Sequence, residues 1–328
     1  MSSPPTANAA TRITLDAEVP PALAGKRLDQ IAASLFPDYS RARLQDWIRA
    51  GSLRVNGEQR RPRDPLQAGD RLHIEAELAQ ADTWEAEAMP LDIVFEDEHL
   101  LLINKPAGTV VHPAAGHRAG TLLNGLLHRH PQLGELPRAG IVHRLDKDTT
   151  GLMVVAKSLP AHTALVRQLQ ARAVGREYEA VVQGLLTGGG TVDAPLERHP
   201  VNRKKRAVVA GGKVAITHYR LLRRFRAHSH VRVKLETGRT HQIRVHMAHI
   251  RHPLVGDPLY GGRLQLPAGG SPALRDGLQQ FRRQALHAAR LSLLHPVSGE
   301  PLSWDAPLPA DMSALLQVLA ADSVGEVS

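Results

Sequence analysis

The sequence has no cysteine among its 328 residues. This absence excludes a disulfide framework, a thiolate nucleophile and any zinc or iron–sulfur site with cysteine ligands. Only 3% of the residues are aromatic, which is too few for a broad surface that stacks single-stranded bases. No run approaches the ~18 apolar residues of a membrane span, and the first residues lack the features of a signal peptide. We therefore expect a cytoplasmic protein without a membrane partner.

Negative charge is also scarce, because 41 Lys+Arg stand against 32 Asp+Glu and give a formal net charge of +9. Eight of these cations are lysines, which leaves 41 − 8 = 33 arginines. The planar fork of arginine binds phosphate with two parallel hydrogen bonds, so a nucleic-acid partner is the first expectation. An Arg-rich composition can also reflect genome base composition, and motifs must decide between the two. The hydrophobic content of 42% is enough for a core, and the length suggests about two domains.

The first domain is expected over 21–76, after a small and polar tail at 1–20 that we expect to be disordered. Apolar residues at helical spacing predict a helix over 26–36. A second helix is predicted over 40–51, with a serine at its cap and a glycine at its end. The Asn-Gly pair within 53–57 predicts a type I′ turn, because both residues tolerate positive φ. The result is a small helix–helix–hairpin module.

This order, with the text RLDQIAASLFPDYSRARLQDWIRAGSLRVNG, resembles the S-four-type RNA-binding domain. In that family the second helix and the loop before the hairpin face RNA. The resemblance therefore implies RNA contacts from Arg41, Arg43, Arg49 and Arg54. The alternative is a solvated basic face on a structural module. The next segment, 77–90, is acidic and rich in small residues, and we expect it to be a linker.

The second domain is expected over 91–312, followed by a C-terminal tail at 313–328. Its short strands and few helices do not alternate strictly, which favours an α+β fold. The predicted strands are 91–95, 100–104, 178–183, 231–236 and 291–294, and the predicted helices are 121–130 and 160–172.

The segment 140–151, GIVHRLDKDTTG, has the densest cluster of polar and charged residues between strand-like pieces. Loops held by a rigid sheet commonly carry catalytic residues. Asp146 lies between Arg144 and Lys147, and such cations keep a carboxylate ionised. An ionised carboxylate can attack a sugar carbon or an electron-poor ring. A structural salt bridge or a cap for the next turn remains the alternative.

A different chemistry also fits these residues. Asp146-Lys147-Asp148-Thr149 matches the Asp-x-Asp pattern of haloacid-dehalogenase-type phosphotransferases, whose first aspartate is phosphorylated. That pattern needs an apolar strand that ends at the first aspartate, and His143 and Arg144 interrupt it here. Such enzymes also need later acidic ligands for magnesium, and no convincing pair follows.

Four segments in order resemble the pseudouridine synthases of the RluA and RluD type. They are VFEDEHLLLINKPAGTVVHP at 94–113, the loop GIVHRLDKDTTGLMVVAK, REYEAVVQG at 176–184 and LETGRTHQIRVHMAHIRHPLVGDPLYG at 235–261. The upstream RNA-binding module is typical of the RluD-like branch. The resemblance implies a catalytic domain with a mixed, largely antiparallel sheet.

The resemblance also implies roles for four residues. Asp146 would be the catalytic aspartate, Arg244 would pair with it, and Tyr178 would pack on the target base. Arg144 would fill the space that the flipped nucleotide leaves. The reaction turns uridine into pseudouridine without redox change or group transfer, so no cofactor and no metal are expected. Asp146 could attack the anomeric carbon, add to carbon six of the ring or abstract a sugar proton, and sequence does not choose among these.

The RluD-like branch favours large-subunit (23S) ribosomal RNA as the partner, whereas other relatives act on transfer RNA. A monomer is typical of the family. A non-catalytic RNA-binding ribosome-assembly factor is the alternative from another class. Loss of Asp146, Tyr178 or Arg244 would mark such a protein, and all three are present.

Two further clusters carry charge. His241, His246, His249 and His252 could suggest zinc, but the H-E-x-x-H pattern is absent, and packing or polar contacts are expected instead. Arg203, Lys204, Lys205 and Arg206 precede a Gly-Gly turn and predict a basic hairpin tip that reaches RNA phosphate, with a solvated loop as the alternative.

Overall fold

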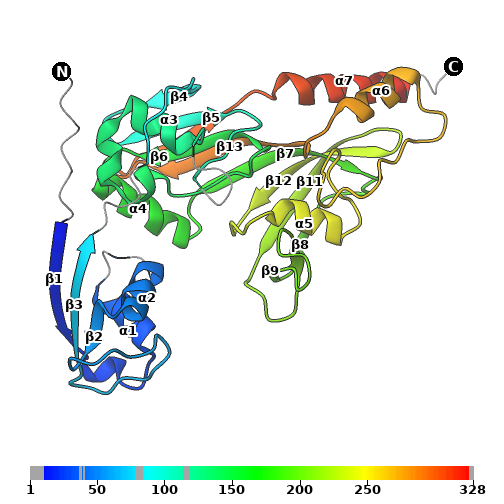
Figure 1. Cartoon of the computed structure of the whole chain (residues 1–328). Coiled ribbons are helices and arrows are strands. Elements are labelled where there is room, and N and C mark those ends of the chain that lie inside the picture. Colours follow the sequence, from blue (N-terminus) through cyan, green and yellow to red (C-terminus); the bar gives the residue numbers. More distant parts are fainter. Residues whose placement is uncertain (1–10, 37–38, 40, 79–83, 114–118, 325–328) are drawn as a thin grey trace, which may run out of the picture. The chain divides into compact units, whose positions relative to one another are not determined.

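The computed structural model describes residues 11–36, 39, 41–78, 84–113 and 119–324, and Figure 1 shows the chain. The chain divides into two compact units, Met1–Thr83 and Trp84–Ser328. None of the helices in these described ranges is long and apolar enough to cross a membrane.

The first unit packs two helices on a three-stranded antiparallel sheet with strand order β1-β3-β2. Its elements are β1 (Thr11–Glu18), η1 (Pro21–Leu23), α1 (Leu28–Leu35), α2 (Arg41–Ala50), β2 (Leu53–Val55) and β3 (Arg71–Leu78). The core is formed by apolar side chains from both helices and from β2 and β3, with Trp47 buried among them as its helical phase predicts. The predicted helix cap at Ser40 lies outside the described residues.

The expected turn and the expected tail have different outcomes. Asn56 and Gly57 have φ of 52° and 83°, and Val55 and Glu58 exchange two backbone hydrogen bonds of 2.9 Å, so the type I′ turn is confirmed. The disordered tail at 1–20 is wrong for residues 11–20, because β1 pairs with β3 along its full length. Its alternating Ile13, Leu15 and Ala17 pack against the core, while residues 1–10 lie outside the described residues.

The second unit is built on a nine-stranded sheet with the order β4-β5-β6-β13-β7-β12-β11-β8, and β14 pairs with β13. The β13–β6 pair is parallel and the other pairs of this sheet are antiparallel, which confirms the α+β prediction of a mixed, largely antiparallel sheet. The strands are β4 (Ile93–Glu96), β5 (Leu100–Lys105), β6 (Thr150–Ala156), β7 (Gly175–Gln183), β8 (Gly190–Asp193), β11 (Ile216–Arg224), β12 (His228–Leu235), β13 (Leu286–Leu294) and β14 (Pro301–Asp305). A separate hairpin joins β9 (Leu196–Arg198) to β10 (Arg206–Val208).

Helices cover both faces of this sheet. They are α3 (Leu122–Arg129), α4 (Leu159–Gln170), α5 (Gln242–His249), α6 (Pro272–Gln280) and α7 (Ala310–Val324), with 3-10 turns η2 (Pro131–Glu135) and η3 (Pro137–Gly140). Every residue of β6 is buried. Its Met153 and Val155 join the core beneath α3, whereas Leu152, Val154 and Ala156 join the core beneath α4. The central strand is therefore a rigid support for the loop that precedes it.

Two predicted boundaries are wrong. The linker expected at 77–90 is shorter, because β3 runs through Leu78, and Trp84 packs on the core of the second unit. The Glu87 carboxylate accepts a hydrogen bond from the Gly120 N–H at 2.6 Å. The tail expected at 313–328 is instead helical as far as Val324, because Met312, Leu315 and Leu319 bury one apolar face against α6. Residues 79–83 and 325–328 lie outside the described part.

Candidate active site

The loop of residues 141–149, here called the Asp146 loop, connects η3 to the start of β6. His143 is half-buried and its Nε2 accepts the Val154 N–H at 3.0 Å, so it anchors the loop to the strand. At the other end, Thr149 Oγ1 accepts a hydrogen bond from Gln284 at 3.0 Å. Gly151 has a φ of 111°, and a Cβ there would lie 2.3 Å from the Ala288 carbonyl oxygen. Only glycine allows this close approach of β6 to β13.

A buried lysine also supports the Asp146 loop. The Lys105 ammonium, at the end of β5, donates to the carbonyls of Pro106, Thr109 and Lys147 at 2.8, 3.0 and 2.8 Å. Burial lowers the pKa of Lys105 to about 8, against the charges of Asp148 and Asp146, which raise it. This cation fixes the backbone immediately after Asp146.

Asp146 is held by an arginine that is itself clamped by a second carboxylate. Arg244 lies on α5, and its Nη1 donates to Asp146 Oδ2 at 2.9 Å. Its Nε and Nη2 donate to the two oxygens of Asp257 at 2.7 and 2.8 Å. The Asp257 carboxylate is fully buried and also accepts the backbone N–H groups of Leu259 and Tyr260. The predicted contact of Arg244 with Asp146 is therefore present, 98 residues apart in sequence.

The charges of this cluster do not balance, since one guanidinium faces two carboxylates. Burial alone would lower the pKa of Arg244, but the hydrogen bonds and charges of Asp257 and Asp146 outweigh it and raise that pKa. Arg244 thus stays cationic throughout the working pH range. The Asp146 side chain is 16% exposed, whereas that of Arg244 is 5% exposed. Asp146 is therefore the most exposed member of the cluster.

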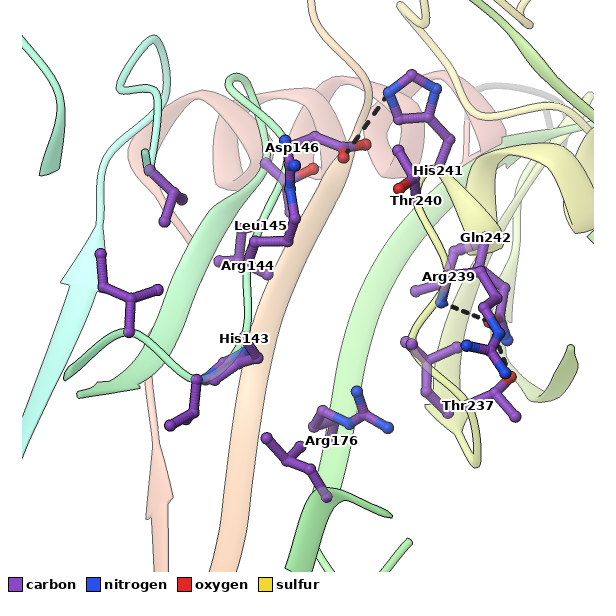
Figure 2. Close-up of a pocket in the computed structure, with 18 of the residues that line it drawn as sticks. His143, Arg144, Leu145, Asp146, Arg176, Thr237, Arg239, Thr240, His241 and Gln242 are labelled. Carbon is purple, nitrogen blue, oxygen red and sulfur yellow. Dashed lines mark hydrogen bonds and ion pairs between the residues drawn. The ribbon is translucent and has the colours of Figure 1, made fainter. Parts of the chain in front are cut away.

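His241 approaches Asp146 from the other side, and Figure 2 shows the ring and the carboxylate facing each other. Its Nε2 lies 3.8 Å from Asp146 Oδ1. Its Nδ1 is 2.8 Å from the hydroxyl of Tyr260, which accepts the Arg206 N–H at 2.8 Å. Burial is the main cause of the lowered pKa of His241, so the ring is neutral at pH 7. Tyr260 thus connects the β9–β10 hairpin to the surroundings of Asp146.

Asp146, His241 and Arg244 line a cavity of about 840 Å³, here called the site cavity. Tyr178 on β7 contributes to its wall and is 6% exposed. Burial raises the pKa of its phenol, so it is neutral at pH 7. The loop 236–241 forms another wall, where the Gln242 side chain accepts from Thr237 and from the Arg239 N–H (Figure 2). The volume lies in the range of small-ligand sites.

The predicted RNA-contacting residues are found in three places. Arg144 is an exposed side chain at the wall of the site cavity. The basic segment 203–206 lies at the tip and return of the β9–β10 hairpin, with Arg203 and Lys204 exposed. The other predicted contacts, Arg41, Arg43, Arg49 and Arg54, belong to the first unit.

Several arginines of the first unit also have structural partners. The Arg41 guanidinium donates to the buried Asp29 carboxylate at 2.7 Å and so ties α2 to α1. Arg49 pairs with Asp46 at 2.7 Å, and Arg54 donates to the Gly51 carbonyl at 3.1 Å. The side chains of Arg41 and Arg49 are nevertheless 48% and 58% exposed, so each keeps a face for a phosphate.

The predicted packing role holds for two of the clustered histidines. His246 is buried between Thr217 Oγ1 and the Ala194 carbonyl, at 2.8 and 2.9 Å. His252 Nδ1 is 2.8 Å from the Gln183 carbonyl. Within the described ranges, no group of three or more His, Asp or Glu side chains is arranged to hold a metal ion.

Sequence reasoning missed Asp257, Lys105 and the part that His241 has in the site. Asp257 and Lys105 both lie inside the quoted motifs, in DPLYG and INKPAG. The sequence signal for both was a charged residue inside an otherwise apolar or turn-forming segment. Their partners are distant in sequence, so only the fold reveals what they contact.

Comparison with known proteins identifies the family. The family model described as RNA pseudouridylate synthase matches residues 99–249, and the S4 domain model matches residues 26–72. The "Ribosomal large subunit pseudouridine synthase D" of Pseudomonas aeruginosa is 61% identical over 93% of this chain and 96% of its own length. The protein of the same name from Escherichia coli is 54% identical over 95% and 96%.

Among solved structures, human RNA Pseudouridylate Synthase Domain Containing 4 superposes with a TM-score of 0.55 at 26% identity, over 70% of this chain and 93% of that one. These matches confirm both resemblances drawn from the motifs. The chain belongs to the RNA pseudouridylate synthase family and carries an S4 domain.

Proposed function

We propose that this protein converts uridine to pseudouridine in large-subunit (23S) ribosomal RNA, with Asp146 as the catalytic carboxylate. The observation that carries the proposal is the direction of Asp146, which Arg244 fixes at the wall of a nucleotide-sized cavity. The names of the relatives at 54–61% identity support ribosomal RNA as the substrate. Transfer RNA is the second candidate, because the same chemistry serves any structured RNA.

The isomerisation breaks the bond from C1′ to N1 of uracil and forms a bond from C1′ to C5. A proton leaves C5 and N1 gains one, so atoms and electrons balance without a further reactant. Arg244 donates to Oδ2 of Asp146, whereas Oδ1 accepts no hydrogen bond from the described residues and is left for the substrate. That oxygen can attack C1′, add to C6 or take a sugar proton, and each route needs the ionised form.

Uridine in a folded RNA must leave its stack before the glycosidic bond becomes accessible, which costs a few kcal/mol. Tyr178 offers an aromatic surface inside the site cavity, and stacking on it recovers about 1–3 kcal/mol. Arg144 is exposed at the cavity wall and fills the position that the base vacates. We further propose that the protein acts as a cytoplasmic monomer and that the S4 domain adds phosphate contacts.

The test uses 23S ribosomal RNA and transfer RNA transcribed with uridine tritiated at C5, because bond formation at C5 displaces the tritium. We expect release from ribosomal RNA by the native protein and none by Asp146→Asn. The matched control is Asp148→Asn in the same loop, which should retain turnover. Phosphotransfer would instead require both aspartates. Release from transfer RNA alone would refute the ribosomal substrate, and no release from any RNA would favour a non-catalytic assembly factor.

A further inference from the structure

Arg176 is a buried cation that the proposed chemistry does not use. It lies on β7 two residues before Tyr178, on the same face of the strand, and lines the site cavity. The residue is 8% exposed. Figure 2 shows its side chain between the Asp146 loop and the loop that carries Thr237 and Arg239.

The guanidinium of Arg176 has no anionic partner in the part of the chain that the structure describes. Within the described ranges no carboxylate oxygen lies within 4.0 Å of it, and its buried Nε has no hydrogen-bond partner. Among the described residues its one hydrogen bond is a long one of 3.4 Å, from Nη2 to the Glu236 carbonyl. A buried charge without a partner costs several kcal/mol, so it is unfavourable in the free protein.

The nearest acids in sequence cannot reach Arg176. Glu177 and Glu179 alternate with it along β7 and therefore lie on the opposite face of the sheet. Glu179 is held there by His230 and Arg232 at 2.8 Å each. The Glu236 carboxylate is also engaged, with His218 at 2.6 Å and Arg172 at 3.0 Å.

The surroundings of Arg176 form a built recess. A Cβ at Gly238 would lie 2.4 Å from Arg176 Nη1, so the glycine makes room for the guanidinium. On the other side is His143, whose pKa is lowered to about 3 by burial and by the charge of Arg176. A neutral histidine supplies no counter-charge. The missing partner is therefore an anion that enters the site cavity from outside.

We propose that Arg176 and the recess at Gly238 form a subsite for one internal phosphodiester group of the RNA strand that carries the target uridine. This inference rests on the proposed function, because it assumes that RNA occupies the site cavity. A planar guanidinium with unused donors matches the two free oxygens of a phosphodiester. The subsite fixes the backbone while Tyr178, on the same strand face, receives the base.

The first experiment measures RNA affinity against KCl concentration for the wild type and Arg176→Met, with a 23S fragment as the probe. We expect Kd to rise about ten- to a hundredfold, as for loss of a charged hydrogen bond. The slope of log affinity against log salt should fall by about 0.7–0.9, the value of one phosphate contact. The control is Arg290→Met, because Arg290 is half-exposed beside Asp305 and does not line the cavity.

The melting temperature separates binding from a structural role. Removal of an unpartnered buried charge should leave the Tm of Arg176→Met unchanged or higher, whereas a structural cation would lower it. If that variant fails to fold, Gly238→Ala is measured in its place. The added methyl group displaces the Arg176 guanidinium, whereas the positive charge of Arg176 is kept. We expect Gly238→Ala to weaken RNA binding as Arg176→Met does. Unchanged affinity and salt slope in a folded variant would overturn the proposal.

A double-mutant cycle identifies the phosphate. Neutral methylphosphonate linkages, each with a matched 2′-deoxy phosphate control, are placed one at a time around the uridine. One position should weaken wild-type binding about tenfold or more and have no effect on Arg176→Met. Equal effects on both proteins at every position would refute the subsite. If the effects of one methylphosphonate and of Arg176→Met are coupled but no tritium is released, the subsite is supported and the proposed function is refuted. The two failures are therefore distinguishable.

Discussion

Replacement of Asp257 by asparagine tests how the Asp146 carboxylate is held. Asp257 accepts two hydrogen bonds from Arg244 and two from backbone N–H groups, and its carboxylate is fully buried. Asparagine keeps the shape but removes the charge and replaces one acceptor with an N–H donor. One side of the Arg244 guanidinium would then face another donor inside the protein.

The expected loss of stability follows from this geometry. Removing one partner of a buried ion pair costs about 3–5 kcal/mol. In a unit of this size each kcal/mol lowers Tm by about 2–4 °C, so Asp257→Asn should melt about 6–20 °C lower. Asp146→Asn should behave differently, because Arg244 keeps both bonds to Asp257 and the buried charges then balance one to one. Its Tm should lie within about 4 °C of the wild type.

Thermal unfolding followed by circular dichroism, together with single-turnover tritium release, measures both effects. Asp257→Asn should lose stability and rate, whereas Asp146→Asn should lose rate alone. The control is Asp305→Asn, whose exposed pair with Arg290 at 3.7 Å contributes about 0–1 kcal/mol. Wild-type Tm and rate in Asp257→Asn would refute the clamp. An equal fall in Tm for both variants would show that Asp146 is as structural as its neighbour.

Two further substitutions test the supports around the site. Lys105→Met should lower the rate of tritium release. The pKa of Lys105 is about 8 in the folded protein, against an ordinary 10.5 in the unfolded chain. Between pH 8 and pH 10.5 the unfolded chain therefore binds more protons than the folded protein. The stability of the wild type relative to this variant should therefore rise from pH 8 to 10.5 and stay flat below pH 8, as measured by urea unfolding; a constant difference would contradict the buried ammonium. Tyr260→Phe removes the hydroxyl that accepts from Arg206 and contacts His241, and should raise KM more than it lowers kcat. Unchanged steady-state constants would show that the β9–β10 hairpin is not coupled to the site.

Local signals predicted several of the regular elements but missed others, among them β8, β11, β14, α5 and α6. Periodic apolar residues located α3 and α4, and the Asn-Gly pair located the turn after β2. β1 was missed because its alternation is short and follows a polar stretch. α7 was missed because its apolar repeat continues directly from a loop near the end of the chain.

The composition of the site was less accessible from sequence. Asp146 stood out because charges surround it locally, but its pairing with Arg244 came from the family resemblance and spans 98 residues. Asp257 and Lys105 act through partners that only the fold brings close. Arg176 shows the limit most clearly, because two glutamates lie within three residues of it and suggest a paired charge. The alternation of β7 places both on the other face and leaves the guanidinium without a carboxylate partner among the described residues.

The site cavity contains two charge imbalances of opposite sign. Around Arg244 there is one carboxylate too many, and around Arg176 there is one cation too many. Figure 2 shows Asp146 in the upper part of the view and Arg176 in the lower part, and both charges act on the phenol of Tyr178. A nucleotide brings its own negative charge, which would repel an ionised Asp146 if the phosphate settled near it. Under the proposed function, the Arg176 cation attracts the phosphate away from this carboxylate, so the sugar and base are left beside Asp146.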